Sequence, residues 1–485
     1  MRIKFVITII GFLIFNLTSA QNTVEYSKLI EEAKNYYSSK HYQKSANKYK
    51  DAFNIFNGKA YPKDRYKAAC SYSLAGDIEL SFYHLMKLAN DTYNDYEQIT
   101  TDSDLILLHN DKRWDKLLLI IKSNKNKYGF KYLVDKNVTN AKEKNEKEII
   151  HLFKEYLKSE TFRQKENPYW DFEGMNIPDD FLWPLGMYNL NDRTPPIQCK
   201  IIGIFPVKYE YFALKSVFSH LDENNEIQID NIITVYAKKI KDGFKLSSST
   251  QYHRKIWDKR IIDNVTYYIH PEHKFNEVEA KKMSKFNDSI SSLFEIPPLK
   301  FDYFTSNYSR EIVQVLGHDY MPRMYRPEQT GGIADINNNI IYAGNNSEYY
   351  PHELVHLYIN EKANNYRHFL IEEGIATLFG GSSGYSLEWH LRKLNEFLSE
   401  NPEYNLDTID KLKTDIPNGE YLTDFRYVVG GLICKNIYDK EGMEGLFNAM
   451  ESGRTNKDFY NLVLKKLDVK KENFGKYIKL EVKKY

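Results

Sequence analysis

The spacing of apolar residues changes twice along this chain of 485 residues, and these changes constrain the fold more than any other feature of the sequence. Up to about residue 128, small and apolar residues recur at helical spacing. They then alternate at the two-residue spacing of strands, in the segments 199–206, 209–217, 227–237 and 264–270. Beyond about residue 275 the helical spacing returns. We therefore predict an α+β protein of several domains, which the length also suggests at ~150 residues per domain.

The charges of the chain almost cancel, with 67 Lys and Arg against 66 Asp and Glu and a net charge of +1. This balance argues against a protein built mainly to bind nucleic acid or an anionic membrane, since both partners need a basic excess. The content of 42% hydrophobic and 27% charged residues is typical of a globular protein. Cys70, Cys199 and Cys434 lie too far apart for a CxxC metal motif or a disulfide framework, so we expect buried thiols.

The first twenty residues have the pattern of a secretory signal peptide. Arg2 and Lys4 precede an apolar run over residues 5–17, and small residues end the segment at Ala20. The run is shorter than the ~20 residues of a membrane-spanning helix, and an uncleaved anchor is the alternative. No later segment holds 18 uninterrupted apolar residues. We predict a signal peptide at 1–20 and an exported, periplasmic or secreted protein whose mature form has no membrane span.

Residues 21–128 contain two copies of one helical pattern, about 36 residues apart. The first copy has small and aromatic residues at Ala33, Tyr36, Tyr42, Ser45, Tyr49 and Ala52, and the second at Ala69, Tyr72, Gly76, Ser81, Leu85 and Leu88. The pattern resembles tetratricopeptide repeats, in which small residues let paired helices approach closely and aromatic residues fill the gaps. The resemblance implies either a concave surface that binds a protein partner or a helical spacer.

Residues 140–270 are expected to form a second module. It begins with a mixed-charge run at 140–148, which is a linker or the solvated start of a helix, and continues into the alternating segments named above. One helix followed by a meander of long strands resembles the nuclear-transport-factor-2 and cystatin-like α+β folds. The module shows no catalytic group of residues, and we interpret it as structural or substrate-orienting.

The last part, 271–485, returns to helical spacing around short strand-like segments. An amphipathic helix is predicted over 278–294 and a shorter helix over 309–316, with a strand at 299–303 between them. Two further strands at 331–335 and 339–343 flank Ile336-Asn337-Asn338, a favourable hairpin turn.

His352-Glu353-Leu354-Val355-His356 follows the hairpin and is an HExxH motif. On a helix, positions four apart lie on one face, so His352 and His356 can bind one metal ion at ~2.0–2.1 Å. Glu353 lies one step round the helix, where it can accept a proton from a metal-bound water and return it to a leaving amine. The pentapeptide also occurs by chance, in which case both histidines are core or capping residues.

A catalytic zinc site needs a third protein ligand and one position that stays open for water. Glu373 lies seventeen residues after His356, in Ile371-Glu372-Glu373-Gly374-Ile375-Ala376. A helix is predicted over 369–379, ended by Gly380-Gly381, and it can run back beside the HExxH helix so that a carboxylate reaches the metal.

HExxH followed by Glu in an EGxA context resembles the gluzincin zinc metallopeptidases. The resemblance implies a mostly helical catalytic domain with a small sheet over 271–485, and zinc held by His352, His356 and Glu373. The neighbouring Glu372 is then expected to be solvated. A metzincin is excluded because Lys362 occupies the position of its third histidine.

The gluzincin resemblance also implies a Tyr or His that hydrogen-bonds the developing oxyanion. Tyr427-Val428-Val429-Gly430-Gly431 resembles the Tyr-x-x-Gly-Gly helix of that family, and Tyr427 is the candidate. Tyr421 is the second choice, and with 39 Tyr in the chain both can instead be packing residues. His368 and His390 lack ligand spacing, and Pro271 interrupts the His270-Pro271-Glu272-His273 sequence, so none of these histidines is assigned a metal.

Together these features predict an exported zinc metallopeptidase that acts on a peptide or protein substrate. Glu353 is its general base, and Tyr427 steadies the oxyanion. The segment 339–343 is the expected sheet edge to which a substrate adds as a strand. Two alternatives stay open: a binding protein of the tetratricopeptide type with a vestigial zinc site, and a zinc hydrolase that cleaves an amide other than a peptide.

Overall fold

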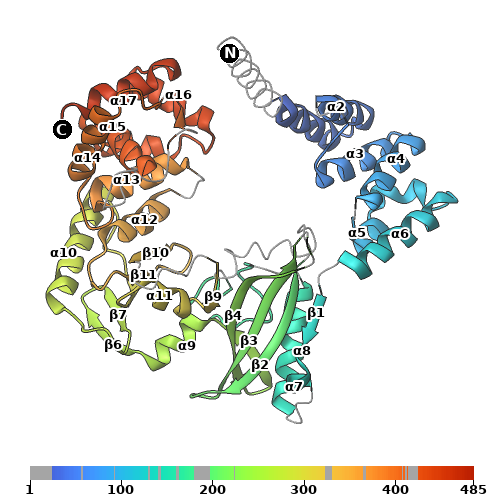
Figure 1. Cartoon of the computed structure of the whole chain (residues 1–485), viewed down its shortest axis with the longest axis horizontal. Coiled ribbons are helices and arrows are strands. Elements are labelled where there is room, and N and C mark those ends of the chain that lie inside the picture. Colours follow the sequence, from blue (N-terminus) through green and yellow to red (C-terminus); the bar gives the residue numbers. More distant parts are fainter. Residues whose placement is uncertain are drawn as a thin grey trace, which may run out of the picture. The chain divides into compact units, whose positions relative to one another are not determined.

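A computed structural model describes most of the chain in two compact units, one formed mainly by residues up to 133 and the other by most of the remainder (Figure 1). The residues described are 25–55, 58–91, 93–128, 131–139, 144–159, 163–179, 197–222, 224, 226–322, 330–363, 367–406, 408–409, 412 and 424–485. The signal peptide predicted at 1–20 and Tyr421 lie outside these residues. Within the described part, no helix has both the length and the apolar character that crossing a bilayer requires.

The N-terminal part is a stack of helices, as the helical spacing predicts. A helix over 25–38 is followed by α2 (Tyr42–Ile55), α3 (Pro62–Leu74), α4 (Ile78–Asn90), α5 (Tyr96–Thr101), η1 (Ser103–Leu108) and α6 (Arg113–Tyr128). The Ser45 hydroxyl donates to the Ala33 carbonyl at 2.8 Å, and the Ser81 hydroxyl donates to the Ala69 carbonyl at the same distance. The two bonds are 36 residues apart, so the repeat in the sequence is also a repeat of helix contacts.

The next part contains a sheet of six strands with the order β1-β2-β3-β4-β5, to which β9 is added on β4. Its elements are β1 (Lys131–Val134), α7 (Lys136–Thr139), α8 (Lys144–Ser159), β2 (Gln198–Pro206), β3 (Tyr211–Leu221), β4 (Ile227–Ile240), β5 (Gly243–Ser247), α9 (Ser249–Ile256) and β9 (His318–Tyr320). The long strands β2, β3 and β4 are those that the alternating pattern predicts. The mixed-charge run is, from Lys144 onwards, the start of α8.

A second sheet of five strands, called sheet B here, has the order β10-β11-β8-β7-β6. Its strands are β6 (Asp258–Ile262), β7 (Val265–Ile269), β8 (Phe301–Thr305), β10 (Gly331–Asp335) and β11 (Ile340–Gly344), with α10 (Glu277–Phe294) and α11 (Ser309–Val315) between them. The central strands β7, β8 and β11 are parallel, and β6 and β10 are antiparallel to their neighbours.

Sheet B differs from the sequence prediction in two ways. Residues 264–270 were grouped with the preceding strands, but β7 pairs with β8 in the second sheet. The segment 339–343 was the predicted edge, which is wrong because β11 lies between β10 and β8 and all five of its residues are buried. Chain order could not show this, since parallel neighbours are joined by long crossovers such as α10. The continuous apolar run of β11 was the available signal of a central strand.

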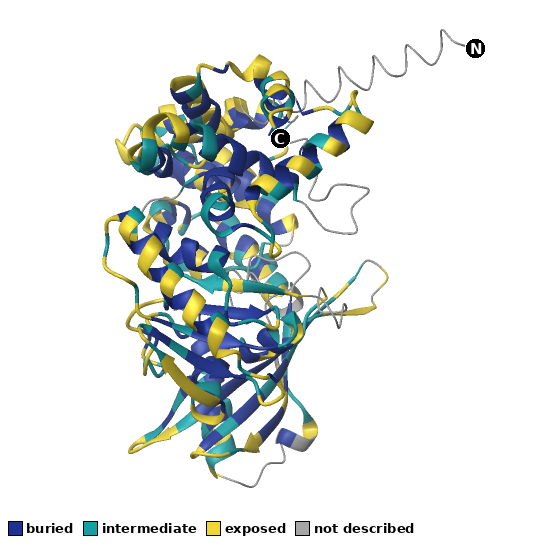
Figure 2. Ribbon diagram, turned by 90° about the vertical axis from the view of Figure 1, so that its left-hand side faces the viewer, coloured by how far each residue is buried: buried dark blue, intermediate teal, exposed yellow. Residues whose placement is uncertain are grey.

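Sheet B separates two cores, because successive side chains of a strand point to opposite faces. Tyr267, Tyr303 and Ile341 pack into the large core of the C-terminal helices. Tyr268 and Phe304 belong to a smaller core on the other face, together with residues of α11. The C-terminal helices are α12 (Pro351–Lys362), α13 (Phe369–Gly380), α14 (Leu387–Glu400), α15 (Phe425–Met450), α16 (Asn456–Leu467), η5 (Lys471–Asn473) and α17 (Phe474–Val482). In Figure 2 the buried residues follow the inner faces of these helices.

Helices α13 and α15 approach each other through glycines. A Cβ at Gly374 would lie 2.5 Å from the Gly430 carbonyl oxygen, and a Cβ at Gly430 would lie 2.3 Å from the Leu370 oxygen. Both distances are far below van der Waals contact, and the atoms met belong to the backbone, so the helices could not keep this spacing with any larger residue. The glycines of the EGxA and Tyr-x-x-Gly-Gly sequences therefore allow the two helix backbones to pack in close contact.

We expect Gly430→Ala to lower the free energy of unfolding by about 3 kcal/mol, since the added methyl group forces two helix backbones apart. Gly445→Ala on the same helix is the matched control, because the added Cβ there meets side-chain atoms of Glu441 and Ile437. In urea unfolding, Gly445→Ala should lower the free energy of unfolding by less than Gly430→Ala does. Equal stability losses in the two variants would contradict the close-packing role of Gly430.

Candidate metal centre

The HExxH motif forms the first turns of α12. Pro351 occupies the first helical position, where its missing N–H is no loss and its fixed φ favours the helix. His352, Glu353 and His356 are all buried, with 5%, 7% and 9% of their surface exposed. The far end of α12 is capped by Arg367, whose guanidinium donates to the carbonyls of Ile359 at 3.0 Å and Ala363 at 3.2 Å. The helix that presents the two imidazoles is thus fixed at both ends.

Glu373 on α13 meets both imidazoles. Its Oε2 lies 3.3 Å from His352 Nε2 and 3.6 Å from His356 Nε2, and the two Nε2 atoms are 3.3 Å apart. The three residues form a buried or half-buried group whose ligand atoms could hold one metal ion. The predicted His352/His356/Glu373 constellation is therefore present in the structure.

The backbone after α13 orients His352. Nδ1 of this histidine lies 2.6 Å from the carbonyl oxygen of Gly381, a geometry in which Nδ1–H donates and Nε2 keeps its lone pair for a metal. The approach requires Gly380, since a Cβ there would lie 2.5 Å from the backbone nitrogen of His352. The sequence reading of Gly380-Gly381 as a helix end is confirmed, and the structure adds this orienting contact, which the sequence did not reveal.

Glu372 also turns toward the site instead of being fully solvated. Its carboxylate lies 3.8 Å from Nδ1 of His356 and 3.7 Å from Nε of Arg367, and its side chain is 31% exposed. A carboxylate behind a ligating imidazole fixes the orientation of the ring and raises its basicity. The two adjacent glutamates therefore have different positions: Glu373 faces the Nε2 atoms and Glu372 faces the rear of His356.

The electrostatics of the group favour a cation at its centre. Burial alone would lower the pKa of His356, but hydrogen bonding and charge from Glu373 raise it to about 9. Burial alone would raise the pKa of Glu373, yet His352 and His356 hold it well below its ordinary range. Glu373 thus stays ionised at neutral pH and is neutralised by positive charge on its partners, a role that a divalent ion fills equally well.

Glu353 is buried without a partner. In the described part of the chain its carboxylate makes no hydrogen bond and no ion pair. Burial raises the pKa of Tyr350 and of Tyr427, and the charge of Glu353 adds to this rise. A buried carboxylate without a partner is costly in a purely structural setting. The arrangement leaves its oxygens free for a ligand or a proton.

Tyr427 lies against the metal group from the first turns of α15. Its ring stacks on the His352 ring with centroids 5.7 Å apart and an angle of 11° between the planes, and it also contacts Phe369. Burial, followed by the charges of Glu373, Asp424 and Glu353, raises the pKa of Tyr427 far above its ordinary value, so the phenol keeps its proton. The glycine contact between α13 and α15 is one turn away and brings this tyrosine to the site.

His368, His390 and His273 have structural partners. His368 contacts Asn456 and accepts from the Leu370 N–H at the start of α13, and His390 lies 2.9 Å from the Ser382 carbonyl oxygen. Neither is part of the metal group, as expected. Nε2 of His273 lies 2.6 Å from Oε1 of Glu348, and both side chains are 1% exposed.

Two further groups of potential ligands lie close together in the described residues: His270, Glu272 and Glu311, and Cys70, Asp102 and Asp104. In the first, Glu311 already accepts two backbone N–H groups at the start of α11 and Glu272 is exposed. In the second, burial raises the pKa of the Cys70 thiol, which disfavours the thiolate that binds metals.

The His273–Glu348 pair predicts a pH-dependent stability. Burial would lower the pKa of His273, but Glu348 and Asn307 raise it above the ordinary value of 6.5. Because the folded pKa is raised, the contribution of the pair is complete below ~6.5 and is lost as the pH rises through the folded value. At pH 6 we expect His273→Ala to lower the free energy of unfolding by about 3 kcal/mol, since it leaves Glu348 buried without its cation.

Urea unfolding of both proteins across pH 4 to about 9 measures this difference, which should shrink as the pH rises above ~6.5. His253→Ala is a control of opposite sign, because burial lowers the pKa of His253 to about 4. Below pH ~6.5, His253 binds a proton in the unfolded chain but not in the folded protein. The stability of the parent relative to His253→Ala should therefore fall as the pH falls from ~6.5 toward 4. A His273→Ala effect that is constant with pH would contradict the charged pair.

Comparison with known proteins gives no relative: no family model, no curated protein and no solved structure matches this chain. The candidate site therefore rests on the chain's own geometry.

Proposed function

We propose that this protein is a zinc metallopeptidase of the gluzincin kind. The observation that carries the proposal is the convergence of His352, His356 and Glu373 from two helices, with the unpaired carboxylate of Glu353 beside them. Two histidines and one glutamate are a ligand set of catalytic zinc sites, which keep one position open. A structural site would have no use for the buried, unpaired Glu353.

The distances support zinc as the metal. A tetrahedral ion with ligands at ~2.0–2.1 Å separates its donor atoms by ~3.4 Å. The three donor atoms here are 3.3, 3.3 and 3.6 Å apart, so they could hold such an ion with little rearrangement. Bound zinc would supply Lewis-acid activation of a water molecule and of the substrate carbonyl.

The residues of the chain then have distinct roles. A Glu353 carboxylate oxygen accepts the proton from the attacking water and later delivers it to the leaving amine nitrogen. The phenol of Tyr427, which stays protonated, donates a hydrogen bond to the carbonyl oxygen as negative charge develops there. The Gly381 carbonyl holds the His352 ring in its orientation, and Glu372 places a negative charge behind the His356 ring.

We infer that β10, rather than the segment 339–343, is the edge to which a substrate adds as a strand. β10 is the outer strand of sheet B in the described residues, and the Tyr350 ring at the start of α12 lies close to Gly332 of that strand. An extended peptide could hydrogen-bond to this edge through its backbone.

Export belongs to this proposal as well. The segment 1–20 would direct the protein to the periplasm or the exterior, and the helices over 21–128 would offer a surface for a protein partner if they act as tetratricopeptide repeats. The sheet of β1 to β5 would then orient the substrate or have a structural role.

Metal analysis combined with a peptide-library assay tests the proposal. We expect about one zinc ion per chain, loss of that zinc in His356→Ala, and cleavage of peptides by the parent only. Zinc binding without cleavage of any peptide, but with hydrolysis of a glycan-linked or cell-wall amide, would show the alternative hydrolase. Absence of both zinc and amide hydrolysis would leave a binding protein.

Tyr427→Phe separates oxyanion stabilisation from packing. The ring and its stacking on His352 are kept, and only the donor is removed, so we expect kcat to fall by about 10²–10³-fold with KM and zinc content nearly unchanged. Tyr438→Phe on the same helix is the control, since Tyr438 packs against Phe379 in the core of the helices. Full kcat in Tyr427→Phe would assign Tyr427 to packing alone.

A further inference from the structure

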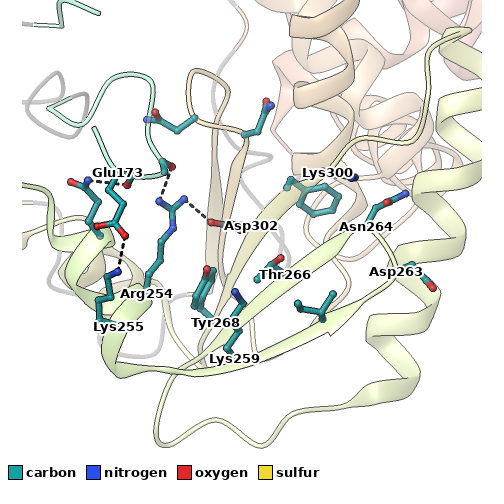
Figure 3. A pocket seen from close by; sticks show the side chains of 16 residues that line it. Glu173, Arg254, Lys255, Lys259, Asp263, Asn264, Thr266, Tyr268, Lys300 and Asp302 are labelled. Carbon is teal, nitrogen blue, oxygen red and sulfur yellow. Dashed lines mark hydrogen bonds and ion pairs between the residues drawn. The ribbon is translucent and has the colours of Figure 1, made fainter. Parts of the chain in front are cut away.

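The face of sheet B that points away from the metal helices is only partly covered. Residues of α11 pack over Phe304 and Tyr342 on this face. Toward β6 the covering stops, and a groove of about 710 Å³ remains, with Thr266 and Asp302 on its floor and Arg254 of α9 at its side (Figure 3). We call it the lysine groove, since Lys259 and Lys300 also line it.

The lysine groove carries a surplus of positive charge. Two of the three carboxylates that line it are paired with cations, Asp302 with Arg254 at 2.6 Å and Glu173 with Lys255 at 2.8 Å. Asp263 accepts a hydrogen bond from Ser284 at 2.6 Å and keeps its negative charge. Among the described residues, Lys259 and Lys300 form no ion pair; the Lys259 ammonium lies over the Tyr268 ring at 5.8 Å, and its charge also acts on Asp302. The four cations and three carboxylates of the lining thus leave a net positive charge that can attract an anionic ligand.

The groove borders an open sheet edge. β6 is the last strand of sheet B and pairs with β7 alone in the part of the chain that the structure describes, and its first four residues are exposed. Lys259 is opposite Tyr268 in the register, and Ile261 is opposite Thr266, so both side chains lie on the groove face. An extended peptide can add to such an edge through its backbone, with alternate side chains over the groove.

The spacing of the lysines favours an extended ligand over a small anion. Lys259 is level with Tyr268 on β7, whereas Lys300 precedes Phe301, which is level with Val265. At ~3.3 Å per residue these levels are roughly 10–13 Å apart along the strands. The aromatic floor offers little to a stacking ligand such as a nucleobase, because Tyr268 is 6% exposed and already stacked on Phe304.

We propose that the lysine groove and the β6 edge bind an extended, acidic peptide segment of a protein partner. The backbone of the segment pairs with β6, and its acidic side chains lie over the groove face next to Lys259, while Lys300, which precedes β8 two strands further into sheet B, adds to the positive potential of the groove. This surface is at the opposite edge of sheet B from β10, so the proposal is independent of the metal centre and of the reaction assigned to it.

Fluorescence polarisation with a labelled peptide of alternating Glu and Val tests the proposal. The full chain carries Glu353→Gln, so that a cleaved probe is not mistaken for a released one. At low ionic strength we expect saturable binding, weakened at least about tenfold by Lys259→Glu with Lys300→Glu, because attraction becomes repulsion. The matched control, Lys239→Glu with Lys241→Glu, reverses two exposed lysines at the β4–β5 turn outside the groove and should bind as the parent does.

Strand addition is tested with the same peptide methylated on alternate backbone nitrogens. This probe keeps every carboxylate but cannot pair as a strand, and we expect at least about tenfold weaker binding in the orientation that blocks the paired edge. Equal binding of both probes, unchanged binding by the Lys259→Glu/Lys300→Glu variant, or tighter binding of a uronic-acid oligosaccharide at the groove would each overturn the proposal.

Discussion

Glu353→Gln should reduce kcat by about 10²–10⁴-fold while the zinc content stays at the level of the parent. The amide has the size of the carboxylate but cannot accept a proton, so the attacking water and the leaving amine lose their proton carrier. Glu353 lies outside the ligand group, and its carboxylate has no partner in the described residues, so the substitution breaks no ion pair. The fold and the metal site should therefore survive, and the loss should appear in kcat rather than in KM.

The measurement is steady-state kinetics on the best substrate of the peptide library, with zinc determined on the same samples. Glu361→Gln is the matched control, since Glu361 is an exposed residue of the same helix. It should retain kcat. A Glu353→Gln enzyme with full turnover would remove the general base from the mechanism, and a variant without zinc would show that Glu353 acts on the metal site itself.

The parts of this site that depend on local spacing could be predicted from the sequence. Two histidines four residues apart on a helix must share a face, and Gly380-Gly381 must end α13. The convergence of Glu373 followed from the short connection between the two predicted helices, which favours an antiparallel pair. The same reasoning explains why the predicted ranges of α10, α11 and the β10–β11 hairpin agree with the structure, since their apolar spacing and turn residues are local signals.

The parts that depend on contacts between distant segments could not be predicted. The position of β11 inside sheet B follows from its parallel pairing with β8, to which no local pattern corresponds. The sequence predicts a solvated Glu372, because no local pattern shows which distant groups a charged side chain meets. In the structure Glu372 lies between Arg367 and the rear of the His356 ring. The glycine contact that places Tyr427 was visible in the sequence only as two short motifs, and the pairing of Gly374 with Gly430 required the structure.

Glu373→Gln is expected to remove zinc from the protein and with it all peptide hydrolysis. The amide keeps one neutral oxygen but loses the charge that holds the two histidines and balances a divalent ion. Loss of a residue that merely supports a ligand weakens metal binding 10–100-fold, so loss of the ligand itself should exceed about 100-fold. Dialysis against a buffered zinc solution followed by metal analysis measures this affinity.

The adjacent Glu372 provides the sharpest comparison, because the two residues share a helix and a chemistry and differ only in the atoms they face. Glu372 is 3.8 Å from the rear of the His356 ring, so Glu372→Gln should weaken zinc binding by about tenfold and keep measurable activity. Circular dichroism in the presence of a chelator shows whether both variants retain the fold. If Glu372→Gln lost zinc and Glu373→Gln kept it, the third ligand would be Glu372. The face of α13 that points to the two histidines would then be that of Glu372 and not that of Glu373.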